Sequence, residues 1–158
     1  SFMGSYETHG VRSIACSSVE LNVEQSRFFL KYPGEWHFYN RSIDREMTYK
    51  NILSESKISL CPRGTGPSTI RIWESLASGC IPLVVSDNKK MPLENKIDWD
   101  KICIFVPLWH ASLAGTIINE FLNNYATEQL QEVSNCIVEN YNRWFSSNAI
   151  HRVIFEAI

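Results

Sequence analysis

The sequence lacks the patterns that would assign it to a membrane or repetitive class. No apolar run approaches the ~20 residues that a membrane-spanning helix needs, and no signal-peptide pattern opens the chain. We therefore expect this segment to make no membrane contact. The chain also has no internal repeat, low-complexity segment or linker, and its composition excludes disorder, collagen-like repeats and coiled coils.

The sequence also has no large excess of positive or of negative residues. Fifteen Lys and Arg residues stand against 17 Asp and Glu residues, which gives a net charge of −2. Such a balance provides no electrostatic surface for non-specific nucleic-acid binding, so no nucleic-acid partner is expected.

Cysteines are few, and their spacing follows no known motif. The five cysteines form no C-x-x-C pair, which argues against a zinc site or a redox motif. Cys61, Cys80 and Cys103 lie in or beside apolar runs, where a free thiol behaves as a small hydrophobic group. A chain of 158 residues can bury a stable core without disulfide bonds, so we predict buried thiols and no disulfide framework.

Short apolar runs alternate with helical patterns along the chain. A wholly apolar run such as Ile81–Val85 is typical of a strand buried on both faces of a parallel sheet. The alternation predicts one α/β domain, a Rossmann-like doubly wound parallel sheet. Strands are predicted at 1–4, 36–39, 58–61, 81–85 and 102–106, and helices at 11–30, 44–53, 68–78, 111–125, 128–145 and 149–158.

Ligands of doubly wound sheets bind at the carboxyl ends of the strands. The loops predicted at that edge are 5–10, 40–41, 62–67 and 86–92. Two common nucleotide fingerprints are absent. Gly64-Thr65-Gly66 is not followed by the third glycine of G-x-G-x-x-G, and no P-loop pattern occurs. A dehydrogenase or a P-loop enzyme is therefore disfavoured.

The most informative stretch is the loop and helix at 62–79. Its two glycines permit a tight turn and a close backbone approach to a ligand. Ser68 and Thr69 stand where the predicted helix would present free N–H groups and the positive end of its dipole. Arg63 precedes the turn. This arrangement suits an anionic ligand.

The predicted helix has two different faces. Arg71, Glu74 and Ser75 share one face at helical spacing, and Ile70, Trp73 and Ala77 share another. We expect the aliphatic face to be buried and the arginine and carboxylate to point outward, where they could bind the diphosphate and ribose of a sugar nucleotide. The alternative is an exposed Arg71–Glu74 surface pair with no ligand.

Residues 56–99 resemble the signature of the exostosin family of glycosyltransferases. The resemblance rests on an ordered series: Ser-Lys, Leu, Pro-x-Gly, Thr-x-Arg-x-x-Glu, Gly-Cys-Ile-Pro, Ser-Asp, Pro and Asp-Trp. The opening Phe2-x-Gly4, the following Gly10-Val11-Arg12 and the tail from Asn142 fit more loosely. The resemblance implies that 1–158 is an exostosin-like nucleotide-sugar-binding domain, the C-terminal donor-binding half of a two-domain GT-B fold.

The family resemblance also implies an activity and a set of site residues. The activity would be an inverting hexosyl or pentosyl transfer from a nucleotide-diphosphate donor, a UDP-sugar, to a glycan acceptor. Arg71 and Glu74 would bind the diphosphate and the ribose, while Arg63, Gly64 and Thr69 would shape a phosphate cradle. Arg12 would assist the phosphates or pair with an acidic neighbour, Glu7 or Glu20. The donor-binding candidates are Arg12, Arg63, Gly64, Ser68, Thr69, Arg71 and Glu74.

The implied partners extend beyond this chain. An N-terminal acceptor domain, in the same chain or a partner chain, would supply the acceptor site and the general base. A nucleotide-sugar-binding or partner-stabilising module without turnover is the alternative function. The compartment depends on the organism: the Golgi lumen in a eukaryote, the cytoplasm in a bacterium or a virus.

Metal chemistry has one candidate motif. Asp98-Trp99-Asp100 spells the D-x-D of a different class of glycosyltransferases. We predict no metal there and no required cofactor, because GT-B enzymes usually stabilise the leaving diphosphate with basic side chains and a helix terminus. The four histidines are too dispersed for a ligand cluster. His9 is expected at the surface, with a contact to donor or acceptor as the alternative, and Asp87 either caps a turn or contacts the sugar.

Overall fold

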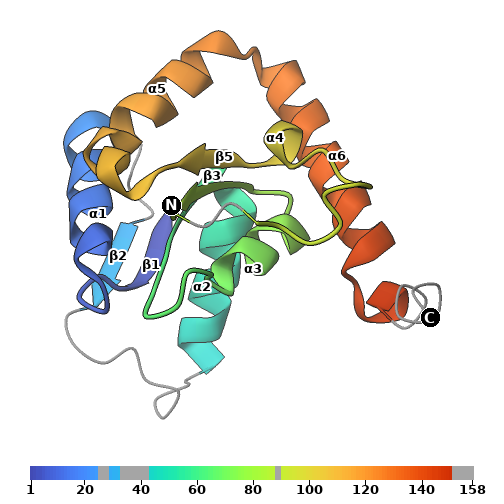
Figure 1. Ribbon diagram of the computed structural model, residues 1–158, viewed down its shortest axis with the longest axis horizontal. Coiled ribbons are helices and arrows are strands. Elements are labelled where there is room, and N and C mark those ends of the chain that lie inside the picture. The colour runs from blue at the N-terminus through green and yellow to red at the C-terminus, as the bar shows by residue number, and fades with distance from the viewer. Residues whose placement is uncertain (25–28, 33–42, 88–89, 151–158) are drawn as a thin grey trace.

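The computed structural model describes residues 1–24, 29–32, 43–87 and 90–150. Figure 1 shows a sheet with helices on its two sides. The elements are β1 (Phe2–Ser5), α1 (Gly10–Asn22), β2 (Phe29–Tyr32), α2 (Ile43–Glu55), β3 (Ile58–Pro62), α3 (Arg71–Ala77), β4 (Ile81–Val85), α4 (Trp99–Ile102), β5 (Ile104–Val106), a 3₁₀ helix η1 (Leu108–Leu113), α5 (Ala114–Asn124) and α6 (Thr127–Trp144).

All strand pairs in the described residues are parallel. β1 pairs with β2, and β3, β4 and β5 form a three-stranded ladder in that order. The two groups meet where Leu60 of β3 donates its N–H to the carbonyl of Ser1, 2.8 Å away, at the start of β1. The order across the sheet is therefore β2-β1-β3-β4-β5, and it reverses between β1 and β3. This order confirms the predicted Rossmann-like doubly wound sheet.

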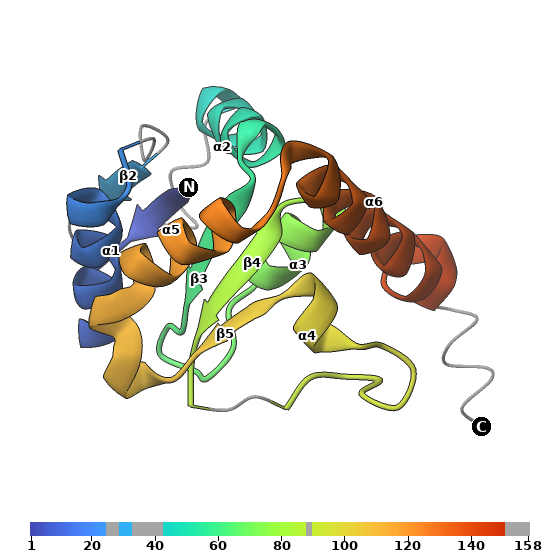
Figure 2. The ribbon, with the colours of Figure 1, turned by 90° about the horizontal axis from the view of Figure 1, so that it is seen from above.

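Helices cover the sheet on opposite sides. α1 and α5 pack together, while α2 and α3 lie on the other side (Figures 1 and 2). The hydroxyl of Ser18 on α1 donates to Ser112 O (2.6 Å) and accepts from Gly115 N (3.0 Å). Gly115 lets the two helices approach closely, because a Cβ there would lie 2.3 Å from Ser18 O. In the described part of the chain, no helix has both the length and the apolar character needed to cross a bilayer.

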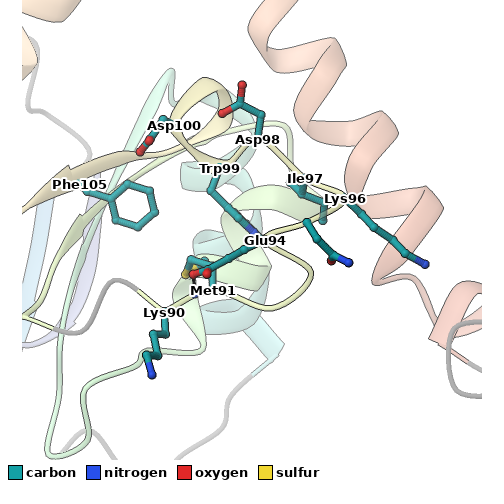
Figure 3. Close-up of a pocket in the computed structure, with 10 residues that line it drawn as sticks. Lys90, Met91, Glu94, Lys96, Ile97, Asp98, Trp99, Asp100 and Phe105 are labelled. Carbon is teal, nitrogen blue, oxygen red and sulfur yellow. Dashed lines mark hydrogen bonds between the residues drawn. The ribbon is translucent and has the colours of Figure 1, made fainter. Parts of the chain in front are cut away.

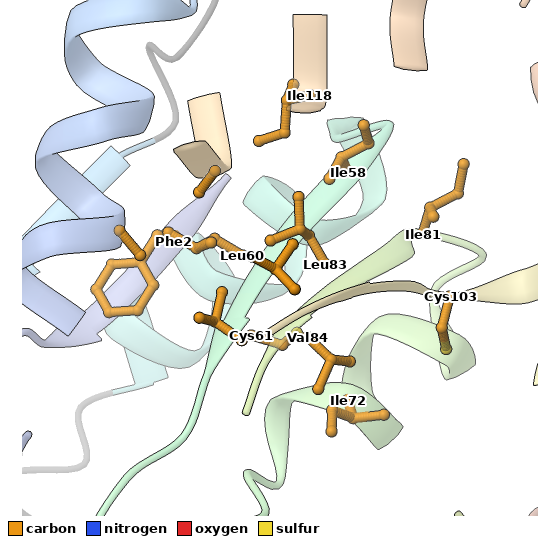
Figure 4. Packing of buried hydrophobic residues seen from close by; sticks show 14 of the residues in the cluster. Phe2, Ile58, Leu60, Cys61, Ile72, Ile81, Leu83, Val84, Cys103 and Ile118 are labelled. Atoms are coloured by element: carbon orange, nitrogen blue, oxygen red, sulfur yellow. The ribbon is translucent and has the colours of Figure 1, made fainter. Parts of the chain in front are cut away.

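The core lies between the sheet and these helices. All five residues of β4 are buried, as predicted for a central strand. Their apolar neighbours include Phe2, Leu60 and Ile72 (Figure 4). The prediction of free thiols is confirmed: all five cysteines are free and only Cys136 is exposed. Burial raises the pKa of Cys80 to about 12, so its thiol stays protonated at neutral pH.

The last long helix, α6, packs against α3 and α4. The Ser134 hydroxyl on α6 donates to Gly79 O (2.8 Å), directly after α3. At the end of α6, Phe145 lies with its ring centroid 4.9 Å from that of Trp73 and 5.8 Å from that of Trp99. Because these rings belong to segments far apart in sequence, they join α3, α4 and α6 into one packed corner.

Several predicted element boundaries are wrong. The predicted helix at 11–30 ends at Asn22, because Phe29–Tyr32 instead pairs with β1 as a strand. The predicted strand at 102–106 begins only at Ile104, since Ile102 completes α4. The first residues of the helix predicted at 111–125 belong to η1. The predicted strand at 36–39 and most of the helix predicted at 149–158 lie outside the described residues.

Candidate functional site

Arg12 joins the ends of the two strands at which the sheet order reverses. From the first turn of α1, its Nε donates to Arg63 O (2.9 Å) and its Nη1 donates to Ser5 O (2.8 Å). Gly64 leaves room for the guanidinium, because a Cβ there would lie 3.1 Å from Nη2. Arg12 therefore binds carbonyl groups and makes no ion pair with Glu7 or Glu20. Burial, and next the charge of Arg71, lower the pKa of Arg12, so two cations share this region.

Arg71 lies inside the protein, with only 7% of its surface exposed. Its Nη2 donates to Met3 O of β1, and its guanidinium carbon lies 4.6 Å from the centroid of the Phe2 ring. Gly4 leaves space for the Arg71 side chain, since a Cβ there would lie 2.8 Å from Nη2. Nε and Nη1 are buried and have no hydrogen-bond partner among the described residues. A buried cation with two unused donors is costly, so the site is electrostatically incomplete.

The prediction that α3 buries the face of Ile70, Trp73 and Ala77 is wrong. The helix buries Arg71 and Ser75 together with Ile72 and Leu76, whereas Ile70 is 73% exposed. The Ser75 hydroxyl donates to Arg71 O inside the helix (2.7 Å), so burying Ser75 leaves no unpaired hydroxyl. The helix is also shorter than predicted. It begins at Arg71 and has no side-chain cap, so Ser68 and Thr69 precede it and do not form its N-terminus.

Glu74 has an unforeseen partner in Tyr49 of α2. The Tyr49 hydroxyl donates to Glu74 Oε2 at 2.6 Å, and both side chains are half-buried. No ion pair joins Glu74 to Arg71 in the structure, so the alternative of an exposed Arg71–Glu74 surface pair is wrong. The sequence placed Tyr49 on the inner side of its helix, and a buried phenol needs a polar partner, but nothing in the sequence pointed to a residue 25 positions away.

The loop between β3 and α3 carries the other candidates. Arg63 makes only long contacts from its guanidinium, 3.4 Å to the carbonyls of Gly64 and Thr65. Ser68 is exposed and Thr69 is half-buried. The Ser86 hydroxyl, just after β4, donates to Pro67 O (2.8 Å) and ties this loop to the next strand. The structure thus brings Arg12, Arg63 and Gly64 into contact, with Arg71 and Glu74 anchored separately to β1 and α2.

His9 is the N-cap of α1. Its Nδ1 accepts the N–H of Val11 at 3.2 Å, two residues into the helix. A surface position or a ligand contact was expected for His9 from the sequence, and this helix-capping bond was not.

Asparagine is a stronger N-cap than histidine, so we expect His9→Asn to raise the free energy of unfolding by about 0.5 kcal/mol and His9→Ala to lower it by a similar amount. Urea unfolding of the three proteins measures both differences. Equal stability of the alanine and asparagine variants would show that the cap does not form in solution.

A cavity of about 690 Å³ lies away from these arginines. It runs along the segment 90–100 and reaches Phe105 of β5 (Figure 3). Asp98 lines it but pairs with Lys101 (3.1 Å), and Glu94 accepts the Met91 N–H (2.8 Å). In the described segments no three His, Cys, Asp or Glu side chains gather as metal ligands would. None of the predicted donor-binding residues lines this cavity, so we place the candidate site at the β1/β3 edge.

Comparison with known proteins gives one family and a set of curated relatives. Residues 15–121 match the sequence profile of the Exostosin GT47 domain. The chain is 28% identical over 141 residues to the exostosin-1 homolog of Caenorhabditis elegans, covering 81% of this chain and 36% of that protein.

Two plant proteins match shorter stretches of the chain. A probable arabinosyltransferase of Arabidopsis thaliana is 38% identical over 80 residues, which cover 51% of this chain and 18% of that protein. A probable glucuronosyltransferase of Oryza sativa subsp. japonica is 35% identical over 68 residues, which cover 43% and 16% respectively. The chain thus spans about a third or less of the length of these curated relatives.

Proposed function

The chain belongs to the Exostosin GT47 family, and on this premise we propose that it is the nucleotide-sugar-binding domain of a glycosyltransferase. The proposed reaction moves a sugar from a nucleotide-diphosphate donor, a UDP-sugar, to a glycan acceptor with inversion. An acceptor hydroxyl oxygen bonds to the anomeric carbon as the bond from that carbon to the diphosphate breaks. A general base takes the hydroxyl proton, and the nucleoside diphosphate leaves. We propose that an N-terminal acceptor domain outside this chain supplies that base.

The observation that carries this proposal is the incompletely paired Arg71. Two buried guanidinium nitrogens without partners among the described residues, close to the second cation Arg12, favour an anionic ligand at the β1/β3 edge. Nε and Nη1 are shielded from solvent, so we propose that neighbouring side chains move aside as the diphosphate enters. A diphosphate oxygen would then accept from both nitrogens, and its charge would be balanced by the two arginines.

The remaining candidates receive supporting roles in the proposal. Arg63, whose guanidinium makes only long contacts with its own loop, would reach the outer phosphate. The backbone at Gly64 and the hydroxyls of Ser68 and Thr69 would line the phosphate cradle. Glu74 accepts from Tyr49 through Oε2, and its other oxygen, Oε1, would accept from the ribose hydroxyls.

Isothermal titration calorimetry with a panel of nucleotide sugars tests the proposal. We expect UDP-sugars to bind and GDP- and CMP-sugars to bind more weakly. Donor turnover with a glycan acceptor, measured in the complete protein, would support a transferase. Donor binding without any turnover would support a nucleotide-sugar-binding module, and failure of every nucleotide sugar to bind would refute both functions.

Removing divalent cations should leave donor binding unchanged. In the proposed site arginine side chains neutralise the diphosphate, so no cation is required. Calorimetric titration of a UDP-sugar in excess chelator should give the dissociation constant found without chelator. A large loss of affinity that manganese restores would instead assign a metal role to the Asp98–Asp100 motif.

A further inference from the structure

Tyr49 holds one oxygen of Glu74 in a short hydrogen bond between two different helices. The phenol belongs to α2 and the carboxylate to α3, and the distance from Tyr49 Oη to Glu74 Oε2 is 2.6 Å. Burial, and also this hydrogen bond, raise the pKa of Tyr49 well above its ordinary value. The phenol therefore keeps its proton at neutral pH and acts only as the donor.

Glu74 is also the carboxylate placed to neutralise Arg71. The two residues are three positions apart on α3, and side chains at that spacing are neighbours on a helix surface. A carboxylate is the strongest partner that a protein offers a guanidinium. In the structure the pair does not form: Arg71 Nε and Nη1 have no partner, while Glu74 Oε2 is bonded to Tyr49. The tyrosine therefore competes with the arginine for the same carboxylate.

We propose that Tyr49 is a positioning residue that holds Glu74 away from Arg71 and so keeps the two buried guanidinium nitrogens available for an anionic ligand. The identity of that ligand as the donor diphosphate rests on the proposed function. The competition between Tyr49 and Arg71 for Glu74 does not, because it follows from the contacts of these three side chains alone.

Removing the Tyr49 hydroxyl should let Glu74 occupy the Arg71 nitrogens that would otherwise bind the anion. In Tyr49→Phe the carboxylate loses its donor and is free to pair with Arg71, so an entering anion must first displace it. We expect the affinity for inorganic pyrophosphate to fall about tenfold, the effect of losing roughly one charge-assisted hydrogen bond. In Tyr49→Phe/Glu74→Gln the uncharged amide cannot neutralise Arg71. The affinity for pyrophosphate should therefore return to within about twofold of wild type, a difference much smaller than the tenfold loss in Tyr49→Phe.

Calorimetric titration with inorganic pyrophosphate measures these differences in four proteins: wild type, Tyr49→Phe, the double variant and Tyr125→Phe. UDP is titrated into the wild type only, because Glu74→Gln would also change the ribose contact that the proposed function assigns to Glu74. The control loses a phenol hydroxyl on the partly exposed Tyr125, which stacks on Phe121 away from the site. Circular dichroism melts verify that each variant is folded. Rescue by the second substitution separates positioning from a structural role, because lost packing between α2 and α3 would weaken the single and double variants alike.

The possible outcomes are distinct. Wild-type pyrophosphate affinity in Tyr49→Phe, or equal losses in the single and double variants, overturns the role of Tyr49. A wild-type protein that binds pyrophosphate but not UDP, with a rescued loss in Tyr49→Phe, supports the role of Tyr49 and refutes the proposed donor. A wild-type protein that binds neither probe overturns both.

Discussion

Replacing Arg71 with methionine is expected to weaken UDP-sugar binding by at least about a hundredfold while the protein stays folded. The reason is that the variant removes two donors for the diphosphate, each roughly 1.5–3 kcal/mol as a charge-assisted hydrogen bond, and tenfold in affinity corresponds to about 1.4 kcal/mol. Met3 O loses its bond from Nη2, but two buried nitrogens without partners among the described residues disappear as well. These effects oppose each other, so the free energy of unfolding should change by about 1 kcal/mol or less. Calorimetry and urea unfolding measure the two quantities.

Two further variants test whether the loss of donor affinity is specific to Arg71 and to the position of its guanidinium. Arg143→Met removes the same charge from an exposed position on α6, where the guanidinium stacks on Trp144, and should bind the donor as wild type does. Gly4→Ala keeps the Arg71 charge but places a Cβ 2.8 Å from Nη2, so the guanidinium must shift. We expect an intermediate loss of affinity, about tenfold. If Arg71→Met binds the donor normally, the diphosphate role of Arg71 is wrong.

Gly115→Ala is expected to produce the largest loss of stability. The added Cβ would lie 2.3 Å from the carbonyl oxygen of Ser18 and 2.9 Å from Cβ of Asn22. Because the first of these atoms is backbone, α1 and α5 must separate, and both hydrogen bonds of the Ser18 hydroxyl weaken. Because the clash is with backbone, we expect a cost at the upper end of the range for overpacking, about 3 kcal/mol, of which the better helix propensity of alanine offsets only about 1 kcal/mol.

Thermal unfolding measures the effect of Gly115→Ala. A net loss of about 2 kcal/mol should lower the Tm by roughly 4–8 °C in a chain of this size. Gly66→Ala is the matched control, because a Cβ at Gly66 meets no atom within 4 Å and should leave the Tm nearly unchanged. A wild-type Tm in Gly115→Ala would mean that the two helices are not in close contact in solution.

The order of strands and helices in the central part of the chain could be predicted because it depends on local patterns. Ile81–Val85 is apolar along its whole length and Ile58–Pro62 is interrupted only by Ser59, a pattern typical of strands buried on both faces of a sheet. Gly79 adopts a φ of 70°, which favours glycine, so the end of α3 was visible in the sequence. The motif at 62–79 could likewise indicate the candidate site, because its glycines and its arginine–glutamate spacing are features of the local sequence.

Periodicity and an ordered motif were enough to predict the parallel α/β fold, the family and the residue types that gather after β3. The three-dimensional structure established which face of α3 turns inward, because Arg71 reaches a carbonyl of β1 that lies 68 positions away in the chain. It likewise decided that Phe29–Tyr32 is a strand and that Glu74 bonds to Tyr49, since the pairing partner of each lies on another element. Helical spacing shows which side chains share a face, but a buried guanidinium and an exposed isoleucine become the favourable arrangement only through contacts that the fold creates.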